Sequence, residues 1–343
     1  MQNEIINGGK LLDKKGDLIE RGYSRSLIKD YSSKDVKASH WRLKEWDYYL
    51  IYNEEYAVAL TFDDNYYMGL NSASIIDFKN AKEKTVSPIR FFTKGKRNLP
   101  PSSKEGDIHY KDKENEVHFT FVPEGRLLEF KLKKYHENKD FEAKLLLVDE
   151  PKESMVILTP FEKDKHFYYN QKIVGFKVEG YFKVGEYQYD FKKEDTRGIL
   201  DWGRGVWTYK NTWYWGSGAG LVDGHEVGFN IGYGFGDTTA ASENAIFYDG
   251  ILHKLEDVKF NIPQDEKGKY LYTQDWTFTS SDGRFEMNFK PIIDRSSLTD
   301  VGLIASDQHQ VFGYFNGRMI LDDGKVIELK DFIGFAERVT NKW

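Results

Sequence analysis

The sequence has no cysteine, only eight prolines and no long apolar run. The absence of Cys among its 343 residues rules out disulfide bonds, thiol catalysis and Cys-ligated metal sites. No apolar run approaches the roughly 20 residues of a membrane-spanning helix. The first residues, MQNEIINGGKLLDKKG, lack the basic-then-apolar pattern of a secretory signal. We therefore expect a cytoplasmic protein with no transmembrane segment.

The sequence also lacks an excess of positive charge. Its net charge is −6, and Lys and Arg are mixed with Asp and Glu without forming a basic stripe, so we expect no nucleic-acid partner. No two histidines have the spacing of a metal motif such as H-E-x-x-H. The G-x-S-x-G motif of serine hydrolases is absent, and no Lys follows GYGFGD as it would in a phosphate-binding loop. We expect neither a metal nor a cofactor.

Aromatic residues are abundant: 24 Phe and 22 Tyr help to bring the aromatic share to 16%. Such residues favour strands, because their rings pack well on a pleated surface. From Trp41 onwards, segments rich in Tyr, Val, Ile and Phe alternate with Asn, Asp and Gly, a pattern typical of successive antiparallel strands. The best short candidates for helix are SLIKDYSS near the start and DFIGFAERV near the end. The predicted fold class is all-β.

The chain contains an internal repeat. WRLKEWDYY from Trp41 resembles WTYKNTWYW from Trp207, and a Ser-rich turn follows an apolar strand in both copies. In both copies an acidic residue lies three residues after a Gly, and a Trp lies six residues after the acid. The matched positions are Gly180, Gly185, Gly198, Asp201 and Trp207 in one copy, and Gly317, Gly324, Gly334, Glu337 and Trp343 in the other. We interpret this as an internal duplication.

The duplication predicts an N-terminal extension over residues 1–38 and two tandem lipocalin-like β-domains over 39–200 and 201–343. A sheet of roughly eight to ten strands tends to curl or close, because closure removes exposed edges. Barrels of about eight strands can hold one small ligand. Two calycin-like antiparallel β-barrels are therefore expected, and a pair of jelly-roll sandwiches is the competing architecture.

Residues 198–244 combine four of the eight tryptophans with many glycines and charged residues, so we expect them to line a pocket. Asp201 is the leading catalytic candidate. Burial beside Trp202 and Trp207 would favour its protonated form, which can donate a proton, and aromatic faces stabilise the cation that results. The alternative is a structural ion pair between Asp201 and Arg204.

Other polar and aromatic residues complete the predicted site, each with a structural alternative. Arg204 could grip an anion, and His309 could shuttle protons. Glu243 could be a second carboxylate positioned by Asn244, or both residues could form a turn. The predicted catalytic residues are Asp201, Arg204 and His309. The predicted ligand-binding residues are Trp202, Trp207, Tyr209, Trp213, Trp215, Asn230, Tyr233, Glu243, Asn244 and Gln310.

The motifs RLKEWDYY, DWGRGVW, GFNIGYGFGD, SENAIFYDG, SDQHQVFGYFNG and GFAERVTNKW resemble a bacterial family called domain of unknown function 2804. This resemblance covers nearly the whole chain but implies no activity. More distantly, the two-barrel plan is similar to the lipocalin-like superfamily that contains carotenoid hydratases. In that superfamily an Asp often lies near a Trp-Gly pair at the end of the first domain, as in Asp201-Trp202-Gly203. The resemblance implies a cavity for an apolar ligand, although a fold does not fix a function.

Three functions are compatible with the predicted pocket residues. The first is an enzyme that hydrates, cyclises or isomerises an apolar or amphipathic small molecule by acid catalysis. The second is a carrier or sensor that only binds such a molecule. The third is carbohydrate binding or glycoside processing, in which Asp201 would act with Glu243 or Glu337 as a pair of carboxylates.

Overall fold

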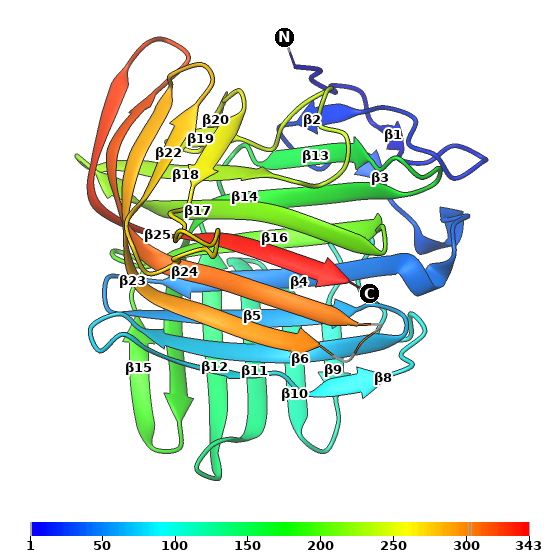
Figure 1. The fold of residues 1–343 in the computed structure, drawn as a ribbon. Coiled ribbons are helices and arrows are strands. Elements are labelled where there is room, and N and C mark those ends of the chain that lie inside the picture. Colours follow the sequence, from blue (N-terminus) through cyan, green and yellow to red (C-terminus); the bar gives the residue numbers. More distant parts are fainter. Residues whose placement is uncertain (1, 301, 303, 343) are drawn as a thin grey trace.

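The computed structural model describes residues 2–300, 302 and 304–342. The prediction of an all-β fold is confirmed (Figure 1): the described residues form strands and two 3-10 turns, η1 (Ser33–Asp35) and η2 (His40–Arg42). Among these residues no helix is long and apolar enough to cross a membrane. Trp343, which the repeat pairs with Trp207, lies outside the described residues.

The first sheet has fourteen strands. Its main path, in hydrogen-bonded order, is β7 (Lys82–Val86), β6 (Met68–Asp77), β5 (Tyr56–Asp64), β4 (Leu43–Tyr52), β16 (Arg197–Val206), β14 (Phe167–Val184), β12 (Lys139–Val148), β11 (Gly125–His136), β10 (Asn115–Val122) and β9 (Ile108–Lys111). Four strands pair beside this path: β13 (Met155–Pro160), β15 (Tyr187–Phe191), β2 (Gly22–Ser24) and β8 (Ile89–Phe91).

The second sheet has nine strands. Their order is β20 (Ile251–Lys254), β19 (Ala245–Tyr248), β18 (His225–Tyr233), β17 (Lys210–Val222), β25 (Val326–Lys342), β24 (Ala305–Ile320), β23 (Phe285–Asp300), β22 (Trp276–Ser280) and β21 (Val258–Asn261). A separate parallel pair joins β1 (Gly9–Lys10) to β3 (Lys29–Asp30). Residues 207–209 connect the two large sheets, because β16 belongs to the first and β17 to the second.

The two sheets share one topology. The path β7-β6-β5-β4-β16-β14-β12-β11-β10 of the first corresponds strand by strand to β20-β19-β18-β17-β25-β24-β23-β22-β21 of the second. We call residues 43–206 (β4 to β16) the first unit and residues 210–342 (β17 to β25) the second unit. In each unit the first strand pairs with the last, so that β4 lies beside β16 and β17 lies beside β25. Residues at matching places on these strands therefore have equivalent neighbours.

Both sheets are strongly curled. In the second sheet the two end strands, β20 and β21, follow each other in sequence with only residues 255–257 between them, which brings the sheet's edges together. In the first sheet, Tyr135 of β11 donates a hydrogen bond to the Lys84 carbonyl of β7 and accepts one from the Ile75 amide. Each curled sheet encloses a core of its own, built from residues such as Phe130 and Trp202 in the first and Phe289 and Phe315 in the second.

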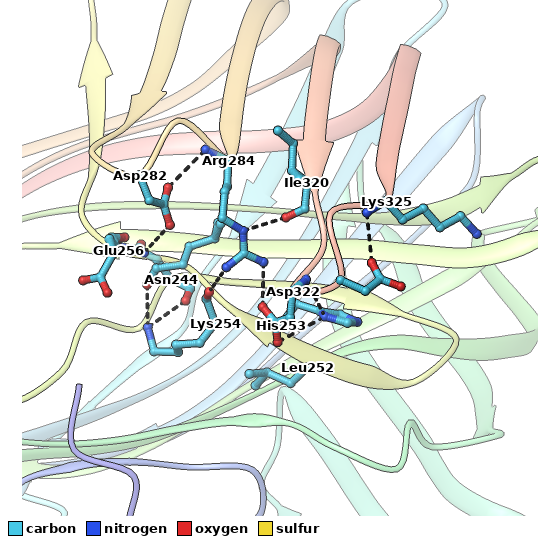
Figure 2. A network of polar contacts seen from close by, with 12 residues as sticks. Asn244, Leu252, His253, Lys254, Glu256, Asp282, Arg284, Ile320, Asp322 and Lys325 are labelled. Atoms are coloured by element: carbon cyan, nitrogen blue, oxygen red, sulfur yellow. Dashed lines mark hydrogen bonds and ion pairs between the residues drawn. The ribbon is translucent and has the colours of Figure 1, made fainter. Parts of the chain in front are cut away.

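Polar contacts tie the rim of the second sheet together where β20 meets the ends of β23 and β24 (Figure 2). Arg284 donates hydrogen bonds to the carbonyls of Lys254 and Ile320 and pairs with Asp322 at 2.6 Å. Lys254 is half-buried and donates to the carbonyl of Asn244 at 2.8 Å. Burial lowers the pKa of Lys254 to about 7. These side-chain contacts stabilise the curled shape of the second sheet at its rim, where the backbone hydrogen bonds between strands end.

A third apolar core lies between the two sheets. It joins residues such as Leu50 and Ile199 of the first sheet to Phe312 and Phe335 of the second. Tyr52 adds a direct polar contact, because its hydroxyl accepts from the Ala219 amide at 2.5 Å and donates to the Ala219 carbonyl at 2.9 Å. The outer faces of the two curled sheets thus pack against each other.

The N-terminal segment, residues 2–38, packs onto both sheets. Ile5, Leu12 and Tyr31 are buried in the first core. Strand β2 pairs with β13, and the Asn3 amide donates to the Ala240 carbonyl of the second unit. This segment therefore covers one part of the first sheet and also contacts the second unit.

The helix candidate DFIGFAERV is wrong, because these residues lie within the strand β25. Phe332 to Glu337 are buried without a break, since one face of β25 points into the second core and the other toward the first sheet. A strand buried on both faces loses the alternation that identifies a half-buried strand. The other candidate, SLIKDYSS, contains β3 and reaches only the first residue of η1.

Candidate functional site

Five polar side chains gather between the two sheets: Asp201, Lys172, Glu337, Gln310 and Glu243. All are buried. We call this group the inter-sheet cluster. Successive residues of a strand point to opposite faces of the sheet, so on β16 Asp201 faces the other sheet together with Ile199.

Asp201 accepts three contacts. The Lys172 ammonium lies 2.8 Å from Oδ1, and the Asn170 amide donates to the same oxygen at 2.5 Å. The indole of Trp46 donates to Oδ2 at 3.1 Å. Lys172 is 2% exposed, and its ammonium also lies 3.9 Å from the centre of the Trp215 ring. Asp201 is therefore a buried carboxylate held by a cation and by two neutral donors.

Glu337 has no cation within salt-bridge distance among the described residues. The indole of Trp213 donates to its Oε1 at 2.9 Å, and the Gln310 amide donates to its Oε2 at 3.0 Å. Gln310 also contacts the Tyr48 hydroxyl, at 3.3 Å from Nε2. Burial raises the pKa of Glu337 to about 7, because the Trp213 hydrogen bond and the more distant charges of Arg295 and Lys172 offset the loss of hydration only in part. Near neutral pH this group both holds and releases a proton.

Glu243 is the third carboxyl group of the inter-sheet cluster. Burial raises its pKa, the Lys172 charge opposes that change, and the Asp201 charge adds to it. Its Oε2 atom has no hydrogen-bond partner, and neither has Oδ1 of the nearby Asn170. Buried polar atoms are nearly always paired. These two atoms therefore leave hydrogen-bonding capacity for a water molecule or a ligand group.

Five rings beside the cluster form what we call the aromatic wall: Trp46, Tyr168, Trp207, Trp213 and Phe235. Tyr168 stacks on Phe235 with ring centres 4.3 Å apart, and Trp207 meets Trp46 and Trp213 edge-on at 5.3 and 5.6 Å. Trp46 and Trp213 are only half-buried. The two indoles that hold the carboxyl groups thus lie at the solvent edge of the wall.

Seven of the residues predicted from sequence lie together here, on the faces that the two sheets turn toward each other. The Trp215 indole donates to Asn230 Oδ1 at 2.8 Å, and the Asn230 amide donates to the Glu243 carbonyl at 2.9 Å. These seven residues are Asp201, Trp207, Trp213, Trp215, Asn230, Glu243 and Gln310.

Arg204 and Trp202 lie on the opposite face of β16, in the first core. The Arg204 guanidinium is fully buried, pairs with Asp47 at 3.0 Å and donates to three carbonyls. The alternative of an ion pair between Arg204 and Asp201 is therefore absent, since Asp201 pairs with Lys172 instead.

The remaining predicted residues lie elsewhere. His309 is on the face of β24 opposite to Gln310, where it contacts Asp294 at 2.7 Å and stacks on a tyrosine ring. Tyr233 packs against the second core. Tyr209 is 40% exposed. Asn244 accepts from the Gly232 amide at 2.6 Å and donates to a carbonyl, so it is fixed by backbone contacts.

Within the inter-sheet cluster, Lys172 is the residue that the sequence analysis does not single out, and Asn170, Tyr168 and Phe235 beside the cluster were not predicted either. Lys172 lies in YYNQKIVGF, where Asn, Gln and Lys interrupt an otherwise apolar strand, and that interruption was the available signal. Trp46 and Tyr48 were noticed in the repeat but were not placed in a site. The internal repeat pairs Glu337 with Asp201, and in the structure both residues belong to the inter-sheet cluster.

Two hollows lie elsewhere in the first sheet. A cavity of about 20 Å³ beside Asp47 and Arg126 has room for about one water. A groove of about 270 Å³ runs along β10–β12 between charged residues including Lys131 and Glu142. Neither hollow is lined by a residue of the inter-sheet cluster. Because the buried carboxyl groups and unpaired atoms occur at the cluster, we place the candidate site there.

Comparisons with known proteins agree with this fold. Residues 2–343 match the family described as domain of unknown function DUF2804. No curated protein matches the sequence. Kievitone hydratase from Nectria haematococca is similar in structure, with a TM-score of 0.50, 11% identity and 88% of each chain covered. This likeness agrees with the expected arrangement of two curled antiparallel sheets and shows the fold alone.

Two further solved structures are similar at lower scores. A putative AttH from Nitrosomonas europaea has a TM-score of 0.49 and 12% identity, over 90% of this chain and 96% of its own. The protein CghA has a TM-score of 0.46 and 8% identity, over 98% of this chain and 97% of its own.

Proposed function

The chain belongs to the DUF2804 family, and we propose that it binds an apolar or amphipathic small molecule between its two sheets and catalyses proton transfer on it. Hydration, cyclisation and isomerisation are the reaction types that this chemistry serves. The observation that carries the proposal is the Glu337 carboxyl group. It is 8% exposed, has a pKa of about 7 and lies at the aromatic wall.

A general acid works best when its pKa lies near the working pH. Glu337 meets that condition, whereas Asp201 is paired with the Lys172 ammonium and is a carboxylate in that pair. The proton donor in this proposal is therefore Glu337, and Asp201 serves as the buried anion. Both carboxyl groups are held by an indole, so their positions are fixed before a ligand arrives.

Hydration illustrates the balance of the step. Glu337 gives its proton to one carbon of a double bond, and the other carbon becomes a cation that aromatic faces and a nearby carboxylate stabilise. Water then adds its oxygen to that carbon and returns a proton to the Glu337 carboxylate. The net change is the addition of one water, and the protein is restored.

The ligand class follows from the lining. The aromatic wall offers ring faces, and most polar atoms of the cluster already have partners within the protein, which suits a molecule that is apolar over most of its surface. The similar fold of a protein named kievitone hydratase is compatible with hydration. We also infer that the two sheets arose by internal duplication, since they share one strand order over nine strands.

The first test is native mass spectrometry of freshly purified protein, followed by identification of whatever dissociates. A retained isoprenoid or other lipid supports the apolar site. Panels of isoprenoids and fatty acids would then be titrated against the fluorescence of Trp46, Trp207 and Trp213. Replacing the fully buried Trp276 of the second core by Phe provides the control, because this residue lies outside the site.

The second test concerns chemistry. Turnover of the bound compound should fall at least 100-fold in Glu337→Gln, while binding stays within a few-fold, because the amide keeps the shape but has no acidic proton. Glu328→Gln is the matched control, since it makes the same change at an exposed position of β25. Binding without turnover in the wild-type protein would instead indicate a carrier. Protein that retains no compound and responds to neither panel would refute the apolar site.

A further inference from the structure

Asp201 and Glu337 occupy equivalent places in the two sheets. Asp201 is on β16, the last strand of the first unit, and Glu337 is on β25, the last strand of the second. In each unit an indole from the paired first strand donates to the carboxyl group: Trp46 on β4 at 3.1 Å and Trp213 on β17 at 2.9 Å. The two carboxyl groups are thus related by the shared topology as well as by their contacts.

The two half-sites differ on their other side. In the first sheet, β14 places Lys172 directly opposite Asp201 in the ladder. In the second sheet, β24 places Gln310 directly opposite Glu337. The same ladder position therefore holds a cation in one unit and a neutral amide in the other. Each side chain contacts its own carboxyl group, at 2.8 Å for Lys172 and 3.0 Å for Gln310.

We infer that the difference between Lys172 and Gln310 gives the two equivalent carboxyl groups opposite roles, so that Asp201 stays an anion while Glu337 carries the proton. A cation in contact stabilises the charged form of a buried carboxyl group, whereas a neutral amide offsets burial only in part. Two titratable groups whose environments separate their protonation behaviour are typical of acid–base sites. Lys172 and Gln310 are positioning residues in this scheme, since they act through the carboxyl groups.

The surrounding charges agree with this assignment. Burial is the main influence that raises the pKa of Glu337, to about 7, and the Asp201 charge adds to it. The charges of Arg295 on β23 and Lys172 on β14 oppose the increase. Glu243, the third carboxyl group, has a raised pKa for the same reasons of burial and of the Asp201 charge. Any titration of the site must therefore separate Glu337 from Glu243.

The assignment can be tested without knowing the ligand, although its use in catalysis rests on the proposed function. Protein labelled with ¹³C at the carboxyl carbons of Asp and Glu would be titrated by NMR between about pH 4 and 9, where raised carboxyl pKa values fall. The resonances would be assigned by their loss in Glu337→Gln, Glu243→Gln and Asp201→Asn. In the wild-type protein Glu337 should titrate near neutral pH.

Exchanging the positioning residues should change this titration in a defined direction. In Gln310→Lys the affinity of Glu337 for a proton should fall at least tenfold, because the new ammonium lies beside it. In Gln310→Met it should rise, because the neutral donor is lost without added charge. Thr279→Lys adds the same charge at an exposed position of β22 and should leave Glu337 unchanged.

Either of two outcomes would overturn the inference. One is a wild-type Glu337 that titrates together with the exposed carboxyl groups. The other is an unchanged Glu337 titration in both Gln310 variants, of which Gln310→Met introduces no buried charge and so keeps the test open if Gln310→Lys does not fold. Titrations that behave as expected in protein that shows no ligand or turnover would refute only the proposed function. Once a substrate is known, the pH profile of turnover in Gln310→Lys should shift with the Glu337 titration.

Discussion

Gly203 is the position at which one methyl group should disturb the site most directly. It lies opposite Trp46 in the pairing of β16 with β4, and the indole lies over it. A Cβ atom at this position would lie 1.9, 2.2 and 2.3 Å from three indole carbons. Gly203 is not among the glycines with positive φ, so alanine strains no backbone angle there. The whole effect of Gly203→Ala should therefore pass through Trp46.

The cost can be worked out from two contributions. Forcing extra volume into a packed site costs about 1–3 kcal/mol. Displacing the indole also breaks its hydrogen bond to the charged Asp201 group, which is worth about 1.5–3 kcal/mol. We expect Gly203→Ala to lower the free energy of unfolding by about 3–5 kcal/mol. With an unfolding entropy of about 0.7 kcal/mol per kelvin for a chain of this length, Tm should fall by about 4–7 °C if unfolding is a single transition.

A double-mutant cycle tests the reasoning. Urea unfolding and calorimetry would be measured for Gly203→Ala, Trp46→Leu and the double variant. If the indole causes the cost, Gly203→Ala should cost less than about 1 kcal/mol in the Trp46→Leu background, because the obstructing ring is gone. An equal cost of Gly203→Ala in both backgrounds would refute the proposed contact. A wild-type-like stability of the single variant Gly203→Ala would do the same.

Three further predictions concern stability. Glu337 binds its proton more tightly in the folded than in the unfolded state, because its pKa rises from 4.5 to about 7. The free energy of unfolding should therefore fall by about 3 kcal/mol as the pH rises through this interval. Glu337→Gln should lack this loss in urea titrations at several pH values, and an identical pH dependence in wild type and variant would contradict the prediction. Arg204→Met should cost about 3–5 kcal/mol in chemical denaturation, because it leaves the Asp47 carboxylate buried without its cation; a cost below about 1 kcal/mol would show that Asp47 adapts. Tyr52→Phe should cost about 1–3 kcal/mol by the same measurement, because the Ala219 amide and carbonyl lose their inter-sheet partner, and unchanged stability would mean that water replaces the hydroxyl.

Alternation along a strand was already enough to separate two of the predicted site residues. If residues 197–206 form a strand, Asp201 and Arg204 must point to opposite faces, as they do in β16. The prediction grouped them because they are close in sequence, but in a strand close residues share a face only at even spacing. His309 and Gln310 on β24 are separated by the same rule.

The all-β class and the equivalent strand order of the two large sheets can both be predicted from sequence patterns. Both follow from patterns that repeat along the chain. The strand pattern repeats every two residues, and the Gly-acid-Trp spacing occurs once at Asp201 and again at Glu337. These signals are local, so they survive in the sequence without knowledge of the partner strands. The resemblance to the family that residues 2–343 match rests instead on specific motifs such as DWGRGVW and GFNIGYGFGD.

The choice of sheet faces that pack against each other depends on long-range packing. The inter-sheet cluster forms because the outer faces of the two sheets bury a common apolar core, and no local pattern records which residues that packing brings together. It set Lys172 against Asp201 and left Glu337 with neutral donors. The difference in their charge state depends on burial and on contacts across strands, both of which arise from long-range packing.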